Sequence, residues 1–356
     1  MALRVQKGPR FSEITTGRFQ ALKKHFAFAF LLCVFFSCAT SECLAQSPDE
    51  GFVTAPDGVR LFYKIVGSGA ETLVAVHGGP GNSLTSILPD FEPLAKNRRV
   101  IYYDQRGNGR SGLVEDDEQL AIAKHVQDLE ALRVHFKLDK MTLLGNSWGG
   151  ILIGYYAAAH PDRVERLIFH SPGTPSRALL SEMDAEVQRR LKRRYTDGQL
   201  KRLAGLSRYQ TWLNASDPRA VCREMFQMVL SVYPFNPVGM KLFKGDVCSG
   251  PEESVRRQRL VTAQIWQELG DYNVLPSLGV VKAPALVIQG AADVIPLKSS
   301  EAWTRAMPNA RLLVIEKSGH LPQVEQPEIF FKAIETFLKG EFPPEAKKIL
   351  TSPNKT

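Results

Sequence analysis

The chain has 356 residues, of which 44% are hydrophobic and 23% charged, so it can bury a full core and is not a natively disordered protein. The formal net charge is +8, and half of this surplus lies in residues 1–45, which hold six basic and two acidic residues. The rest of the chain has a small positive excess without a basic stripe interleaved with aromatic residues. This composition argues against a nucleic-acid partner.

The first 45 residues have the three parts of a signal peptide. Lys23 and Lys24 precede an apolar run over residues 26–36, and a junction with small residues follows at 43–45. The run is shorter than the roughly 20 apolar residues that a membrane span needs. We therefore expect residues 1–45 to be removed and the protein to be exported, to the periplasm or the medium. Cleavage after Ala39 and an uncleaved membrane anchor are the alternatives.

Three of the five cysteines lie in this leader, which leaves Cys222 and Cys248 in the predicted mature chain. An exported protein with two cysteines can form one disulfide. Two unpaired, partly buried thiols remain the alternative at this point.

Strand and helix patterns alternate from about residue 53, which predicts an α/β fold with a mostly parallel sheet and helices on both faces. Apolar runs predict strands at residues 59–66, 72–76, 99–103, 141–144, 167–169, 285–289 and 312–315. Helical spacing predicts helices at residues 118–137, 148–160, 298–307 and 327–339. Residues 46–173 and 266–340 are therefore interpreted as the two parts of one core.

Residues 174–265 interrupt this alternation, because they are rich in charge, helical in propensity and without a clear strand. We interpret them as a helical cap inserted between strands of the core. Their basic stretch at 188–194 predicts a helix packed along Val187, Leu191 and Tyr195 and solvated elsewhere. Contact with an anionic substrate or a membrane is the alternative. Residues 341–356 are predicted to form a flexible tail.

A candidate nucleophile, Ser147, lies in the sequence Gly-Asn-Ser-Trp-Gly at residues 145–149, between a predicted strand and a predicted helix. A serine at such a turn adopts a strained backbone conformation that projects its hydroxyl above the sheet. The flanking glycines avoid collisions with the neighbouring strand and helix.

A serine hydroxyl is a weak nucleophile that needs a base and an orienting acid. Asp293 follows the predicted strand at 285–289, and His320 follows the strand at 312–315. Both residues would meet Ser147 at the carboxyl edge of the sheet, where open α/β folds place their sites. His170, at the end of another strand, is the alternative base.

The sequence His-Gly-Gly-Pro-Gly at residues 77–81 follows the strand at 72–76, where an acyl-transfer enzyme needs an oxyanion donor. A second backbone N–H would come from Trp148, directly after the nucleophile. A phosphate-binding loop is excluded, because no Gly-Lys-Ser/Thr follows.

These segments resemble the prolyl aminopeptidase, or proline iminopeptidase, branch of the α/β-hydrolases, which are serine peptidases. The resemblance covers about residues 52–173 and 266–340. Its motifs are residues 77–81, Tyr-Asp-Gln-Arg-Gly-Asn-Gly-Arg-Ser at 103–111, Asp-Leu-Glu-Ala-Leu-Arg at 128–133 and Gly-Asn-Ser-Trp-Gly-Gly at 145–150. It implies an α/β-hydrolase fold, a triad of Ser147, Asp293 and His320, and oxyanion N–H groups from Gly79 and Trp148. We expect neither a metal nor an organic cofactor.

The chain departs from that branch at two places. Asn146 stands before the nucleophile, where glycine is typical, and cap residues 209–214 lack the glutamate that accompanies tryptophan in proline-specific members. Glu224 is a candidate replacement. We expect a serine hydrolase that cleaves small peptides or amides through an acyl-enzyme, of the aminopeptidase type. A carboxylesterase or lipase-like enzyme is the alternative, followed by a hydrolase-fold binding protein without turnover.

Overall fold

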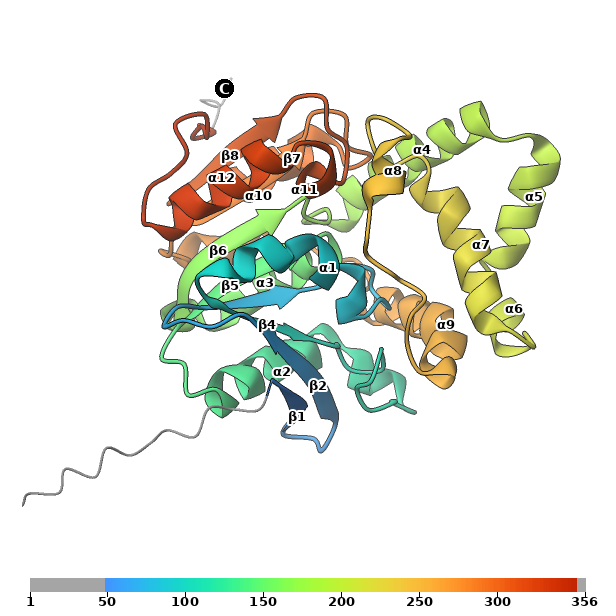
Figure 1. Cartoon of the computed structure of the whole chain (residues 1–356), viewed down its shortest axis with the longest axis horizontal. Helices are drawn as coiled ribbons and strands as arrows, with labels where there is room; N and C mark the ends of the chain where they lie inside the picture. The colour runs from blue at the N-terminus through green and yellow to red at the C-terminus, as the bar shows by residue number, and fades with distance from the viewer. Residues whose placement is uncertain (1–48, 351–356) are drawn as a thin grey trace, which may run out of the picture. The chain divides into compact units, whose positions relative to one another are not determined.

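The computed structural model describes residues 49–350 (Figure 1). Eight strands in this range form one sheet with the order β1-β2-β4-β3-β5-β6-β7-β8. They are β1 (Glu50–Thr54), β2 (Arg60–Val66), β3 (Thr72–Val76), β4 (Arg99–Tyr103), β5 (Met141–Asn146), β6 (Val164–His170), β7 (Ala285–Gly290) and β8 (Ala310–Ile315). The pairings β1–β2 and β2–β4 are antiparallel, and all others are parallel. The predicted mostly parallel sheet is confirmed.

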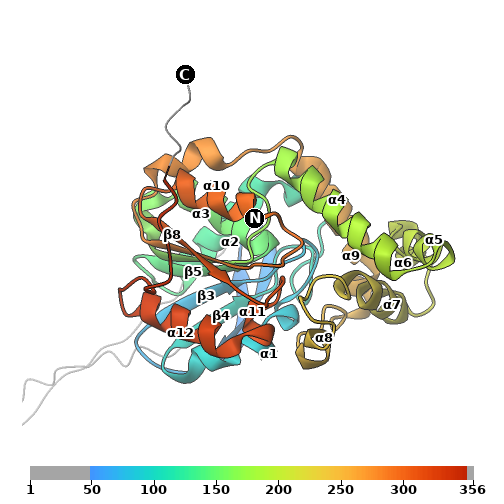
Figure 2. The same ribbon diagram turned by 90° about the horizontal axis from the view of Figure 1, so that it is seen from above.

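Helices cover both faces of the sheet, which explains why its central strands are almost continuously apolar. One buried cluster joins the sheet to α2 (Ile122–His135), α3 (Trp148–Ala159) and α10 (Leu297–Ala306). A second cluster joins the other face to α1 (Leu88–Phe91) and α12 (Pro327–Leu338). Figure 2 shows these helices on opposite sides of the strands.

The segment between β6 and β7 is helical, as the composition of residues 174–265 indicates. It contains α4 (Arg177–Arg194), α5 (Asp197–Leu206), α6 (Tyr209–Leu213), α7 (Pro218–Leu230), α8 (Gly239–Leu242) and α9 (Glu252–Leu269). The last helix continues four residues beyond the predicted boundary at 265. Val187 and Leu191 are buried on α4, so the predicted packing stripe of the basic helix is confirmed at these two positions. Tyr195 follows the last residue of α4, in an extended conformation, and is half-buried.

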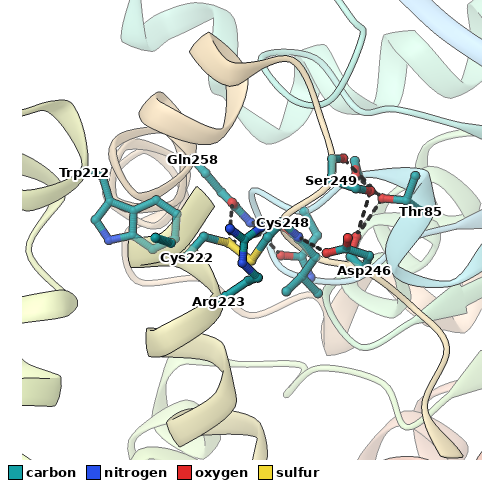
Figure 3. The surroundings of a disulfide bond; sticks show 12 residues. Thr85, Trp212, Cys222, Arg223, Asp246, Cys248, Ser249 and Gln258 are labelled. Atoms are coloured by element: carbon teal, nitrogen blue, oxygen red, sulfur yellow. Dashed lines mark hydrogen bonds between the residues drawn. A yellow bond between two sulfur atoms is a disulfide. The ribbon is translucent and has the colours of Figure 1, made fainter. Parts of the chain in front are cut away.

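Cys222 of α7 forms a disulfide with Cys248, which settles the alternative left open by the sequence (Figure 3). The segment that carries Cys248 also contacts the core. The Thr85 hydroxyl donates to the Asp246 carbonyl at 2.7 Å, and the Asp246 N–H donates to the Thr85 carbonyl at 3.0 Å. The disulfide therefore joins a cap helix to a segment that is hydrogen-bonded to the core.

The structure differs from the sequence prediction at both ends of the described range. β1 was not predicted, because its five residues gain their stability from the pairing with β2. The prediction of a flexible tail is wrong for residues 341–350. There, Leu312 and Lys347 exchange two backbone hydrogen bonds of 2.8 Å, and Ala346 is buried. The β8 edge offers free backbone groups, which this segment uses.

The predicted leader and residues 351–356 lie outside the described residues. Within residues 49–350, no helix has the length and apolar character that crossing a membrane requires.

Candidate active site

Ser147 occupies the tight turn between β5 and α3. Its φ of 52° and ψ of −116° lie in a region that non-glycine residues rarely adopt. Backbone hydrogen bonds hold this conformation: the Ser147 N–H donates to the His170 carbonyl at 3.0 Å, and its carbonyl accepts from Gly150 at 2.8 Å and Gly173 at 2.7 Å. The turn is thus strained and fixed from both sides.

The glycines of the motif are required by the packing around this turn. A Cβ on Gly145 would lie 2.5 Å from the Gly149 carbonyl oxygen, and a Cβ on Gly149 would collide with the Val76 carbonyl oxygen. Both clashes are with backbone atoms, which cannot rotate away. The predicted reason for the G-x-S-x-G pattern is therefore confirmed.

Asp293 and His320 lie in the loops after β7 and β8 and contact each other. His320 Nδ1 is 2.9 and 3.0 Å from the two carboxylate oxygens of Asp293. The Asp293 side chain is fully buried and that of His320 is 8% exposed. Asp293 Oδ1 also accepts the N–H of Ile295 at 3.0 Å, which fixes the carboxylate within its own loop.

The strand order puts Ser147 on the same edge of the sheet as this pair. Asn146 is in register with His170, and Gly290 with Ile315, so the chain segments that follow β5, β6, β7 and β8 leave the sheet at one edge. In the described part of the chain, no hydrogen bond joins the Ser147 hydroxyl to His320. The structure thus brings Asp293 and His320 into contact and places Ser147 at the same edge of the sheet.

His170, the alternative base, is completely buried beside Asn146. The Asn146 amide lies 2.7 Å from His170 Nδ1, and burial lowers the pKa of His170 to about 3. The ring is also enclosed by Phe91 and Phe330. This neutral, enclosed histidine is not open to a substrate. Asn146, which stands where glycine is typical before the nucleophile, donates this hydrogen bond to His170.

The glycine loop at 77–81 runs directly against the nucleophile turn. A Cβ on Gly78 would lie 3.2 Å from the Ser147 Cβ, and Gly79 has a φ of +120°, which strongly favours glycine. Trp148 is the first residue of α3, so its backbone N–H has no acceptor within the helix. The N–H-bearing segments expected at an oxyanion site therefore adjoin Ser147.

Gln105, to which the sequence motifs assigned no role, connects the two sides of this site. Its amide nitrogen donates to the His77 carbonyl at 2.9 Å, and its amide oxygen accepts from the Trp148 indole at 2.9 Å. Gln105 belongs to the motif at 103–111, so the signal was present without an assigned role. It holds the glycine loop against the start of α3.

The next residue of that motif, Arg106, is a buried structural cation. Its guanidinium binds both carboxylate oxygens of Asp128 at 2.8 and 2.6 Å, and Asp57 at 2.8 Å. The motifs at 103–111 and 128–133 are therefore joined by this ion pair.

No cluster of three or more His, Cys, Asp or Glu side chains suited to a metal ion occurs within residues 49–350.

Comparison with known proteins agrees with the fold. Residues 71–327 match the family described as the alpha/beta hydrolase fold. The chain belongs to this family and is a hydrolase of that fold.

Among the members, the chain is similar to proline iminopeptidases. It is 29% identical over 300 residues to the proline iminopeptidase of Heyndrickxia coagulans, covering 82% of this chain and 99% of the relative. It is 30% identical over 299 residues to that of Lactobacillus helveticus, covering 79% and 95%. The esterase EaEST of Exiguobacterium antarcticum superposes with a TM-score of 0.60 at 20% identity, over 81% of this chain and 99% of that one. The latter similarity concerns the fold alone.

Proposed function

We propose that the protein is a serine hydrolase in which Ser147 is the nucleophile, His320 the base and Asp293 the orienting acid. The supporting observation is the buried hydrogen-bonded pair of Asp293 and His320, on the same sheet edge as a serine in a strained turn. The Asp293 carboxylate accepts a hydrogen bond from the Nδ1–H of His320, which leaves Nε2 free to accept a proton.

The proposed reaction forms an acyl-enzyme. Ser147 Oγ bonds to the substrate carbonyl carbon while His320 Nε2 takes the hydroxyl proton. The N–H groups of Gly79 and Trp148 stabilise the oxyanion. Collapse of this intermediate breaks the bond to the leaving amine, which receives the proton from His320. Water then attacks the acyl-enzyme by the same route and releases Ser147.

We further propose that the substrates are small peptides or amides with a free N-terminal amine. The similarity to proline iminopeptidases over nearly their whole length supports this class. The ammonium group of such a substrate needs a carboxylate, because an unpaired charge in a closed site is costly. That carboxylate must come from the cap.

Three acidic residues of the cap already have cationic partners. Glu182 pairs with Lys298 at 2.5 Å, and Glu224 pairs with Arg202 at 2.7 Å on the exposed surface. Glu186 binds two arginines of its own helix, each at 2.7 Å. The expected replacement Glu224 is therefore a poor candidate.

Asp184 is the better candidate, because no hydrogen bond or ion pair engages its carboxylate within residues 49–350. Asp184 is an exposed residue of α4, about one turn from Leu180 and from Val187, and desolvation raises the pKa of its carboxyl. Burial, followed by the charges of Asp293 and Asp184, raises the pKa of Tyr233 to about 12. The Tyr233 ring also contacts the His320 ring, and this supports a place for the Asp184 carboxylate near the proposed site.

A comparison of free and blocked substrates tests the proposal. We expect unblocked aminoacyl arylamides to be hydrolysed, and N-acetylation to lower kcat/KM on the order of 10–100-fold, as for the loss of a charged hydrogen bond worth about 1.5–3 kcal/mol. Asp184→Asn should remove most of this discrimination, whereas the control Glu224→Gln should keep it.

Other outcomes would assign the protein to a different functional class. Equal rates on free and blocked amides would contradict the aminopeptidase proposal, and turnover of aryl esters alone would make the protein an esterase. Absence of turnover, together with no fluorophosphonate labelling of Ser147, would indicate a binding protein.

We also propose that the protein is exported after removal of residues 1–45. The support is the arrangement of Lys23, Lys24 and the apolar run at 26–36. N-terminal sequencing of the protein from fractionated cells should give a start near Gln46. A cytosolic protein that begins at Met1 would contradict export.

A further inference from the structure

One guanidinium of the cap contacts the loop of the proposed catalytic acid. Arg190 of α4 donates through Nη2 to the carbonyl oxygens of Ala292 at 2.9 Å and Asp293 at 3.1 Å. Its Nη1 donates to the carbonyl oxygen of Val232, in the cap segment after α7, at 3.2 Å. The Arg190 side chain is 22% exposed, so these bonds are partly shielded from water. A single side chain thus links a cap helix, a cap loop and the acid loop.

The same cap loop holds the histidine. Tyr233 follows Val232, and its carbonyl accepts the backbone N–H of His320 at 3.0 Å. Its ring lies edge-on to the imidazole, with ring centroids 5.1 Å apart. Glu325 adds a second link, because its carboxylate accepts the N–H of Gly319 at 2.7 Å and that of Asn236 at 3.0 Å.

Apolar contacts join the acid loop to the cap in the same region. Val294 and Ile295, directly after Asp293, are 0% and 2% exposed. They belong to the buried cluster formed by Val187 and Leu191 of α4 and other cap residues. The acid loop is therefore packed into the core of the cap as well as bonded to Arg190.

We propose that Arg190 is a positioning residue, through which the cap sets the alignment of Asp293 and His320 toward Ser147. This inference rests on the proposed function of these three residues. Arg190 acts on backbone carbonyls and does not touch the reacting atoms. A displacement of about 1 Å in a catalytic group can cost about 10²-fold in rate, so a small shift of the acid loop is enough to slow the reaction.

The neighbouring Arg189 provides a matched control. Both arginines bind Glu186, at 2.7 Å, and belong to the same helix. Arg189 is 53% exposed and, in the part of the chain that the structure describes, hydrogen-bonds to Glu186 alone. Replacing Arg189 removes an equivalent ion pair without altering any contact to the acid loop.

The experiment compares Arg190→Ala, Arg190→Lys and Arg189→Ala in the full-length protein. We expect Arg190→Ala to lower kcat and the rate of fluorophosphonate labelling of Ser147 by 10–100-fold, with KM changed less than threefold. Arg190→Lys keeps the charge and a donor and should recover at least a third of the wild-type rate. Arg189→Ala should stay within twofold of wild type. Equal rates for Arg190→Ala and Arg189→Ala, or equal losses, would contradict the proposal.

Two further measurements cover the remaining cases. If Arg190→Ala does not fold, Arg190→Gln is compared with Arg189→Gln: a labelling rate at least threefold lower in Arg190→Gln supports the inference, and equal rates contradict it. Hydrogen exchange of the amides at 291–295 and 318–320 should accelerate in Arg190→Ala but not in Arg189→Ala, and equal exchange contradicts the link. Wild-type protein that is not labelled, or is labelled equally after Ser147→Ala, instead contradicts the proposed function.

Discussion

Ser147 and Asp293 make different contributions to the proposed reaction, and single substitutions separate them. We expect Ser147→Ala to abolish turnover while the protein stays folded, because the hydroxyl has no hydrogen-bond partner within residues 49–350. Asp293→Asn should leave His320 in the wrong tautomer and lower kcat by about 10⁴-fold, the effect in the best-studied triad. Steady-state kinetics with an arylamide, together with circular dichroism, measure both effects.

Ser171 offers the control for this experiment. It follows β6 at the same edge of the sheet, is buried, and has a hydroxyl without a hydrogen-bond partner in the described chain. Ser171→Ala should therefore keep nearly full activity. Near-normal turnover by Ser147→Ala would exclude the covalent mechanism, and a fully active Asp293→Asn would mean that the acid is another residue.

At single residues, sequence motifs could predict those positions whose chemistry depends on local spacing. Ser147 and its glycines form such a case, because the turn itself demands them. The roles of Gln105, Asp184 and Arg190 depend on what the fold brings beside them. Arg190 is one of five arginine and lysine residues in a basic stretch, and only the tertiary contacts distinguish it from Arg189.

At the level of elements, long apolar or amphipathic segments were predictable, and short ones were not. The predicted strands of the core and the helices beside them are present with boundaries shifted by a few residues. The four-residue helix α8 and the strand β1 have no comparable signal, since such short segments are stabilised by their neighbours. The cap could be recognised by composition, whereas its individual helices could not.

The disulfide between α7 and the segment before α9 should stabilise the cap. The two cysteines are 26 residues apart. A bond that closes a loop of this length restricts the unfolded chain and raises the free energy of unfolding by about 3 kcal/mol. We expect Cys222→Ser/Cys248→Ser to lower the free energy of unfolding by about that amount in urea titrations. Adding a reductant to wild type should reproduce the effect.

Peptide mapping of the unreduced, denatured protein checks the bond directly. A linked peptide that contains both Cys222 and Cys248 is expected. Free thiols at both positions would contradict the disulfide.

At the level of the whole molecule, the alternation of apolar strands and helices was enough to predict the fold class, because only a two-sided parallel sheet buries such strands. The order β1-β2-β4-β3-β5 could not be predicted in the same way. Each strand pattern is compatible with several neighbours, and the choice is made by the crossover connections. The burial of His125 could not be predicted either: it lies on the helix predicted at 118–137, and tertiary packing encloses it fully beside Trp148.

Buried histidines should make the folded state sensitive to acid. Burial lowers the pKa of His77 to about 4 and the pKa values of His125 and His170 to about 3, against about 6.5 in the unfolded chain. Between pH 6.5 and pH 4 the unfolded state binds protons that the folded state does not. The contribution of each histidine to the free energy of unfolding should therefore fall as the pH falls, by about 1.4 kcal/mol per pH unit. Burial raises the pKa values of Asp104 and Asp128 to about 6, so these two carboxyls offset part of the decline below pH 6.

Urea titrations at pH 7, 5.5 and 4.5 measure this dependence. His125→Leu removes one of the three titrating groups and should make the decline shallower by about 1.4 kcal/mol per pH unit. An equally steep decline in His125→Leu and in wild type would contradict the expectation.

The backbone bridge between Leu312 and Lys347 has a consequence for how copies of this chain behave in concentrated solution. β8 is the last strand of the sheet, and an outer strand with free N–H and C=O groups is a template onto which a strand of another molecule can add. The returning segment occupies the backbone groups of Leu312, at the middle of β8. The segment around Lys347 therefore covers part of this edge, and an edge with fewer free backbone groups is a poorer template for sheet growth between molecules.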